Sequence, residues 1–82
     1  MKDENGDTFS TSDFYIACYA LTRGAKISHL DRTDPRRVVF VFEDTENGES
    51  VVRDFLYRKA LVEPQDFVEK IKVLKQLLYS SE

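Results

Sequence analysis

Few side chains in this sequence have the chemistry that a catalytic site needs. His29 is the only histidine, and Asp31 and Asp34 follow it closely. A histidine works as a general base when a partner orients it and a pocket holds the substrate against it. The sequence around His29 indicates neither feature, so we expect a structural or surface role. An enzyme would require His29 and one of these aspartates to line a pocket.

Cys18 is the only cysteine, and it lies within an unbroken apolar run from Phe14 to Leu21. Apolar surroundings raise the pKa of a thiol, whereas a nucleophilic cysteine needs a low pKa and a neighbouring base. We therefore expect Cys18 to act as a small buried hydrophobic side chain. A lone thiol cannot form an intrachain disulfide, which favours a reducing cytoplasm as the location.

The sequence predicts no metal or cofactor site. One cysteine and one histidine cannot build a structural zinc centre. The acidic segment 43–48 lacks the ligand spacing and the closing glutamate of a calcium loop. Three glycines, spread along the chain, do not form a phosphate-binding loop. We therefore expect a protein that is not an enzyme.

A basic run between residues 23 and 37 is the one charged feature that stands out. It holds five cationic side chains, which are Arg23, Lys26, Arg32, Arg36 and Arg37. If these projected together, their guanidinium groups could hold a phosphate backbone, so a nucleic-acid-associated accessory protein is the alternative function. We favour ordinary solvated charges, because Asp31 and Asp34 lie in the same run. The net charge of −3 also argues against a general nucleic-acid-binding protein.

The composition indicates one small α+β domain. A chain of 82 residues, 41% of them hydrophobic, is long enough for a single compact core. Residues 1–7 are polar and acidic, so we expect a disordered tail followed by one domain over residues 8–80. The expected element order is α-β-β-α-α, an antiparallel hairpin packed with three helices. A short extra N-terminal strand at residues 7–10 is a weaker expectation.

The first predicted helix starts near Ser12, with Ser12 or Thr11 as the residue that caps its free amide groups. Gly24 suits the left-handed conformation that ends many helices. The residues between are apolar on nearly every side. Such a helix lies at the centre of a core or forms a partner surface.

Two strands are expected next, at residues 25–30 and 37–42, with a hairpin loop at 31–36. The second strand is apolar at both parities, since Val38, Phe40 and Phe42 alternate with Val39 and Val41. A strand of this kind is usually covered on both faces. Two strands alone make a marginal sheet. Either residues 7–10 or a second copy of the chain would therefore complete the sheet or cover it.

Residues 49–56 allow a strand after the Asn47-Gly48 turn or a helix. The helix is favoured, because it gathers Val51, Val52, Phe55 and Leu56 into one stripe and pairs Glu49 with Arg53. The last helix begins at Pro64. Its predicted apolar face consists of Phe67, Val68, Ile71, Leu74, Leu77 and Leu78.

Three segments carry a resemblance to a known family: residues 11–15 (TSDFY), 32–42 (RTDPRRVVFVF) and 60–64 (ALVEP). In this order and spacing the chain, from about residue 9 to residue 78, resembles a family of small uncharacterised prokaryotic and phage proteins, a domain of unknown function. The resemblance implies an autonomous one-domain protein in a prokaryotic or viral cytoplasm. It brings no activity and no functional residues.

The function that the sequence favours is a non-enzymatic protein–protein interaction module, most simply a homodimer. The motivation is the surplus of apolar residues in the first helix and the second strand. The candidate self-association surface consists of Tyr15, Tyr19, Val39 and Val41. No apolar run is long enough to cross a bilayer, so we expect no membrane partner.

Overall fold

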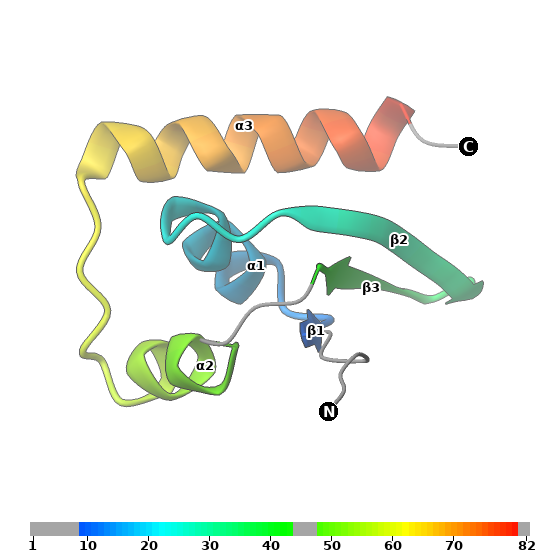
Figure 1. The fold of residues 1–82 in the computed structure, drawn as a ribbon. Helices are drawn as coiled ribbons and strands as arrows, with labels where there is room; N and C mark the ends of the chain where they lie inside the picture. Colours follow the sequence, from blue (N-terminus) through cyan, green and yellow to red (C-terminus); the bar gives the residue numbers. More distant parts are fainter. Residues whose placement is uncertain (1–8, 44–47, 81–82) are drawn as a thin grey trace.

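A computed structural model describes residues 9–43 and 48–80, and Figure 1 shows their arrangement. The described residues form an α+β domain, which confirms the predicted fold class. Its elements are β1 (Phe9–Thr11), α1 (Phe14–Thr22), β2 (Ile27–Asp34), β3 (Arg37–Phe42), α2 (Gly48–Leu56) and α3 (Pro64–Ser80). The predicted tail 1–7 and most of the acidic segment 43–48 lie outside the described residues.

The three strands form an antiparallel sheet in the order β1-β3-β2, so the most apolar strand is the central one. Phe9 and Thr11 of β1 lie opposite Phe42 and Phe40 of β3. The third strand that β3 requires therefore comes from the same chain. The strand expected at residues 7–10 lies at Phe9–Thr11, and residues 7 and 8 lie outside the described part.

The β2–β3 hairpin is longer and its turn tighter than expected. β2 was predicted over residues 25–30, but it runs over Ile27–Asp34 and leaves only Pro35 and Arg36 in the turn. Two register shifts in β2 let its charged residues continue the ladder. Asp34 Oδ1 closes the turn by accepting the backbone N–H of Arg36 at 2.9 Å.

The cap of α1 differs from the prediction by one or two residues. Asp13, rather than Ser12 or Thr11, precedes the helix, and its Oδ1 accepts the backbone N–H groups of Tyr15 and Ile16 at 2.9 and 3.0 Å. Thr11 supports this cap, because its hydroxyl oxygen accepts the backbone N–H of Asp13 at 3.0 Å.

The core forms around α1, which lies between α3 and α2 in Figure 1 and has five consecutive buried residues, 16–20. Phe40 and Phe42 of β3, Val51 of α2 and Leu74 of α3 complete the buried cluster. The predicted face of α3 is correct except at Val68, which is 49% exposed. Because Val68 lies at the edge of this helical face, it extends past the core instead of into it.

Candidate functional site

The connection between α2 and α3 begins with an unusual helix end. The backbone N–H of Lys59 donates to the carbonyl of Asp54 at 2.8 Å, and that of Arg58 donates to Phe55 at 3.2 Å. This pair of hydrogen bonds is the Schellman pattern, which places the residue after the helix in a left-handed conformation. Arg58 occupies that position with a φ of 63°, whereas Gly24 occupies the same position after α1 with a φ of 95°.

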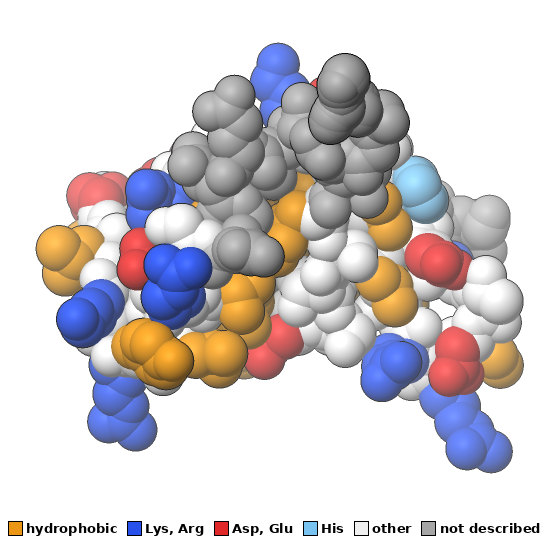
Figure 2. All heavy atoms as spheres, turned by 60° about the horizontal axis from the view of Figure 1, so that its bottom comes forward, with side chains coloured by type: hydrophobic (Ala, Val, Ile, Leu, Met, Phe, Trp, Pro, Cys, Tyr) orange, Lys and Arg blue, Asp and Glu red, His pale blue; other side chains and the backbone are white. Residues whose placement is uncertain are grey.

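Four large hydrophobic side chains are exposed at this connection. The exposed fractions are 62% for Leu56, 67% for Tyr57, 87% for Leu61 and 38% for Val62. We call these four residues together with Arg58 and Lys59 the linker surface. Phe55 and Ala60 pack against the core and so attach this connection to the rest of the domain. On the left of Figure 2, over α2 and the connection, hydrophobic and cationic side chains lie among one another.

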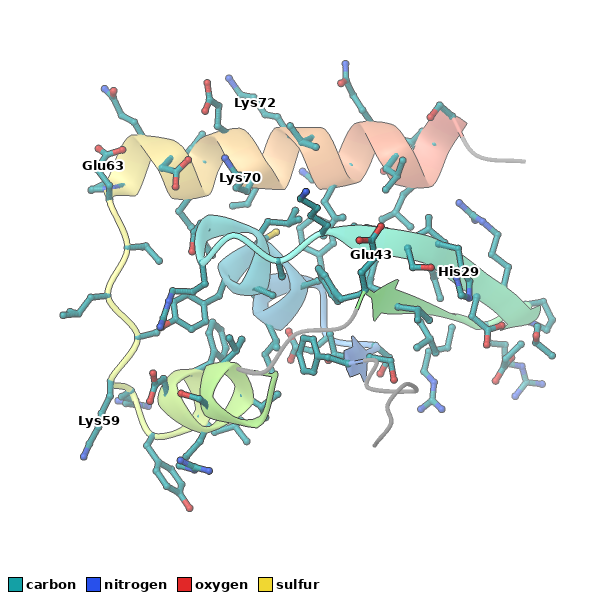
Figure 3. The ribbon with its side chains drawn as sticks, in the orientation of Figure 1. His29, Glu43, Lys59, Glu63, Lys70 and Lys72 are labelled. Carbon is teal, nitrogen blue, oxygen red and sulfur yellow. The ribbon has the colours of Figure 1, made fainter. Side chains whose placement is uncertain are left out.

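The acidic side chains next to the linker surface have partners of their own. Asp54 lies 3.6 Å from the guanidinium of Arg23. Both carboxylate oxygens of Glu63 cap α3, accepting the backbone N–H groups of Gln65 and Asp66 at 3.1 and 2.7 Å. Figure 3 shows Lys59 pointing away from the fold, at the opposite end of the connection from Glu63. The exposed charges of the linker surface itself are therefore positive.

The basic run of residues 23–37 does not form one patch. Arg23 and Lys26 precede β2, whereas Arg36 and Arg37 lie at its far end, beyond eight strand residues. At about 3.3 Å per residue, the two groups are roughly 25 Å apart. Arg32 is engaged elsewhere, because its Nη2 donates to the carbonyl of Leu78 at the end of α3, at 2.8 Å.

Arg23 joins α1 to α2. Its Nη1 donates to the hydroxyl of Tyr19 at 2.7 Å, and its guanidinium carbon lies 5.7 Å from the centre of that ring. The hydrogen bond to Tyr19 and the charge interaction with the same residue, with a smaller contribution from Asp54, raise the pKa of Arg23 above its usual range. This arginine is thus a structural contact at the α1–α2 junction.

The four residues of the candidate self-association surface are not brought together. Tyr19 is 1% exposed and belongs to the core, so a surface of this fold does not include its ring. Tyr15 is 54% exposed on α1, which packs on the face of the sheet that carries Phe40. Val39 and Val41 are half-buried and alternate with Phe40 along β3, so they occupy the opposite face.

His29 and Asp31 share that outer face, where they lie opposite Val41 and Val39. Both groups are on the protein surface beside hydrophobic side chains, which Figure 2 shows next to the pale blue His29. Hydrogen bonds from the side chain and backbone of Thr33, with a smaller contribution from His29, lower the pKa of Asp31. Ser28 Oγ lies 3.0 Å from His29 Nδ1.

Cys18 lies where the sequence predicts, with no exposed surface. Burial, and secondarily the charge of Asp13, raises the pKa of its thiol to about 11. Such a thiol is protonated at neutral pH, whereas the nucleophilic form of cysteine is the thiolate.

The described residues contain no group of three or more His, Cys, Asp or Glu side chains placed to bind a metal ion. A hollow of about 350 Å³ lies on the outer side of α3, lined by Pro64, Gln65, Val68, Glu69 and Lys72. All five come from one helix, so the hollow is an open depression without polar groups converging from other elements.

Among the helices in the described part of the chain, none has the length and apolar content needed to cross a bilayer.

The linker surface is the feature that sequence reasoning missed. A signal for it exists, because five of the seven residues from Leu56 to Val62 are hydrophobic and Pro64 follows after Glu63. Composition alone assigns such residues to a core, however, and only the chain path shows that four of them remain outside.

The comparison with protein families gives a positive result over nearly the whole chain. The family model described as Domain of unknown function (DUF5659) matches residues 6–80. No curated protein and no solved structure matches the chain. The segments 11–15, 32–42 and 60–64 all lie within the matched range. The chain therefore belongs to the family known as Domain of unknown function (DUF5659).

Proposed function

We propose that this protein is a non-enzymatic module that works by binding another protein. The observation that carries the proposal is the linker surface, where four large hydrophobic side chains are exposed within seven residues. Exposed apolar surface on a soluble protein marks an interaction site when it exceeds the scattered hydrophobic residues of an ordinary surface, and here four such side chains lie on one short segment. An 82-residue chain has few hydrophobic side chains to leave outside its core.

Self-association is the more specific form of this proposal. A second copy would bind the outer face of the sheet through Val39 and Val41, which do not belong to the residues packed against the core cluster. The protein would act in the cytoplasm of a prokaryote or of a phage-infected cell, which suits the single buried thiol.

Size-exclusion chromatography with in-line light scattering tests self-association. At high protein concentration we expect about twice the monomer mass of 9.5 kDa. High salt should not dissociate this dimer, because apolar contacts are not screened. The double variant Val39→Thr, Val41→Thr keeps the β-branched shape of both residues and should shift the equilibrium to monomer. A monomer mass for the unmodified protein at every concentration would reject self-association.

Nucleic-acid binding through the basic run is the alternative. Its support is limited to the hairpin tip, where Arg36 and Arg37 are exposed. Binding to a nucleic acid weakens steeply with salt, with a slope set by the number of phosphates contacted. A titration of labelled DNA or RNA at two salt concentrations therefore distinguishes the two functions, and we expect no binding at physiological salt.

A further inference from the structure

We propose that the linker surface binds an acidic segment of a partner protein that also carries large apolar side chains. This inference rests on the proposed protein-binding function and adds the chemistry of the partner and the place where it binds. Leu56, Tyr57, Leu61 and Val62 provide the apolar contact. Arg58 and Lys59, both exposed, provide the positive charge within it.

The positive charge of the linker surface favours an acidic partner. Asp54 is paired with Arg23, and Glu63 caps α3, so neither carboxylate neutralises Arg58 or Lys59. Arg58 and Lys59 are the only charged residues between Leu56 and Val62, and both are exposed. An acidic segment that also carries apolar side chains would complement both the charge and the exposed hydrophobic side chains of this connection.

The backbone at Arg58 gives independent support. A left-handed conformation is unfavourable for a residue with a Cβ atom, and glycine is the usual residue at this position of the Schellman pattern. The same chain uses glycine there after α1. Strain of this kind collects at functional positions. We infer that arginine stands at position 58 for its side chain, which is exposed.

Other occupants fit the surface less well. A second copy bound symmetrically would set Arg58 and Lys59 against the same two charges. An anionic membrane gains only about 1 kcal/mol from each cationic residue near its surface, and two such residues do not make an anchor. A nucleic acid would leave Leu56, Leu61 and Val62 uncovered by any matching apolar surface.

The first experiment uses a labelled synthetic peptide of about 16 residues, with leucine and phenylalanine on one helical face and glutamate and aspartate on the other. Binding to the full chain is followed by fluorescence anisotropy, and the binding site is mapped from backbone amide shifts in NMR spectra. We expect a dissociation constant of roughly 10–100 µM and shifts centred on residues 54–62. A peptide with lysine in place of every acidic residue should not bind.

Matched variants separate the linker surface from the rest of the protein. Leu61→Ala and Lys59→Glu should each weaken the binding about three- to tenfold. The controls Val73→Ala and Lys72→Glu make the same kinds of change at exposed positions of α3 and should leave the binding unchanged. Leu61 is 87% exposed, so we expect its substitution to leave the stability of the fold within about 0.5 kcal/mol.

Three results would overturn the inference: no binding at about 500 µM peptide, shifts outside the linker surface, or equal losses in the control variants. Binding of anionic phosphatidylserine vesicles or of an oligonucleotide at this surface, without peptide binding, would also overturn it. A negative result in the peptide experiment can be distinguished from a failure of self-association, because the mass of the dimer is measured in the absence of peptide. Loss of both the dimer and the peptide would remove the support for the proposed function itself.

Discussion

The left-handed backbone conformation at Arg58 predicts that the substitution Arg58→Gly makes the protein more stable. A residue with a Cβ atom loses about 1–2 kcal/mol in this conformation, and glycine avoids that loss. Glycine also gains about 0.5–1 kcal/mol of chain entropy in the unfolded state, which offsets part of the benefit. The net expectation is a gain of about 0.5–1 kcal/mol in the free energy of unfolding, or roughly 2–8 °C in melting temperature.

Urea and thermal unfolding followed by circular dichroism measure this effect, with two controls. Arg58→Ala removes the guanidinium but keeps the Cβ atom, so its stability should stay within about 0.5 kcal/mol of the unmodified protein. Gly24→Ala should lose about 1 kcal/mol, and only through backbone conformation, because a Cβ atom there meets no atom within 4 Å. If Arg58→Gly is no more stable than Arg58→Ala, the position is not strained and the argument from strain fails.

Four further changes test the core and its caps. Leu74→Ala leaves a cavity at a fully buried site and should lower the free energy of unfolding by about 2–5 kcal/mol. A thermal melt should show this loss as a clearly lower melting temperature. Asp13→Ala removes the cap of α1 and should lose about 1 kcal/mol in urea unfolding. Tyr19→Phe should lower the free energy of unfolding by about 1 kcal/mol, because it removes the hydroxyl that accepts the hydrogen bond from Arg23. If Tyr19→Phe causes the same loss in an Arg23→Ala background, the two residues are not coupled. The folded protein holds the Cys18 proton more tightly than the unfolded chain does, so the free energy of unfolding should fall as pH rises from 9.0 towards 11. Cys18→Ala should lack that part of the alkaline decline.

Local signals predicted the elements whose boundaries depend on local chemistry. The strand at Arg37–Phe42 has the predicted bounds, because a run of β-branched and aromatic residues between two polar segments has few alternatives. Pro64 marks the start of α3, and Gly24 adopts the left-handed conformation. The choice of helix for α2 is also confirmed, and Val51 of its predicted apolar stripe is buried, whereas Leu56 at the end of the stripe is 62% exposed.

The errors arose where several residues compete for one role or where tertiary contacts decide. Thr11, Ser12 and Asp13 can all cap a helix, and the backbone conformation at Asp13 makes the selection. The charged end of β2 joins the sheet because two register shifts accommodate it, and no local sequence pattern predicts these shifts. The residues of the basic run are near one another in the sequence, but an eight-residue strand separates its two ends in the fold.

The linker surface illustrates the same limit in the residues that matter for function. Hydrophobicity alone does not distinguish Leu74, which is fully buried, from Leu61, which is 87% exposed. The difference comes from position: Leu74 lies on the helical face turned to α1, whereas Leu61 lies in a connection held to the core by Ala60. Because this connection contributes little buried area, its exposed side chains are nearly independent of the stability of the fold. The residues proposed to bind a partner can therefore change without unfolding the domain, and the loss of binding in Leu61→Ala can be interpreted directly.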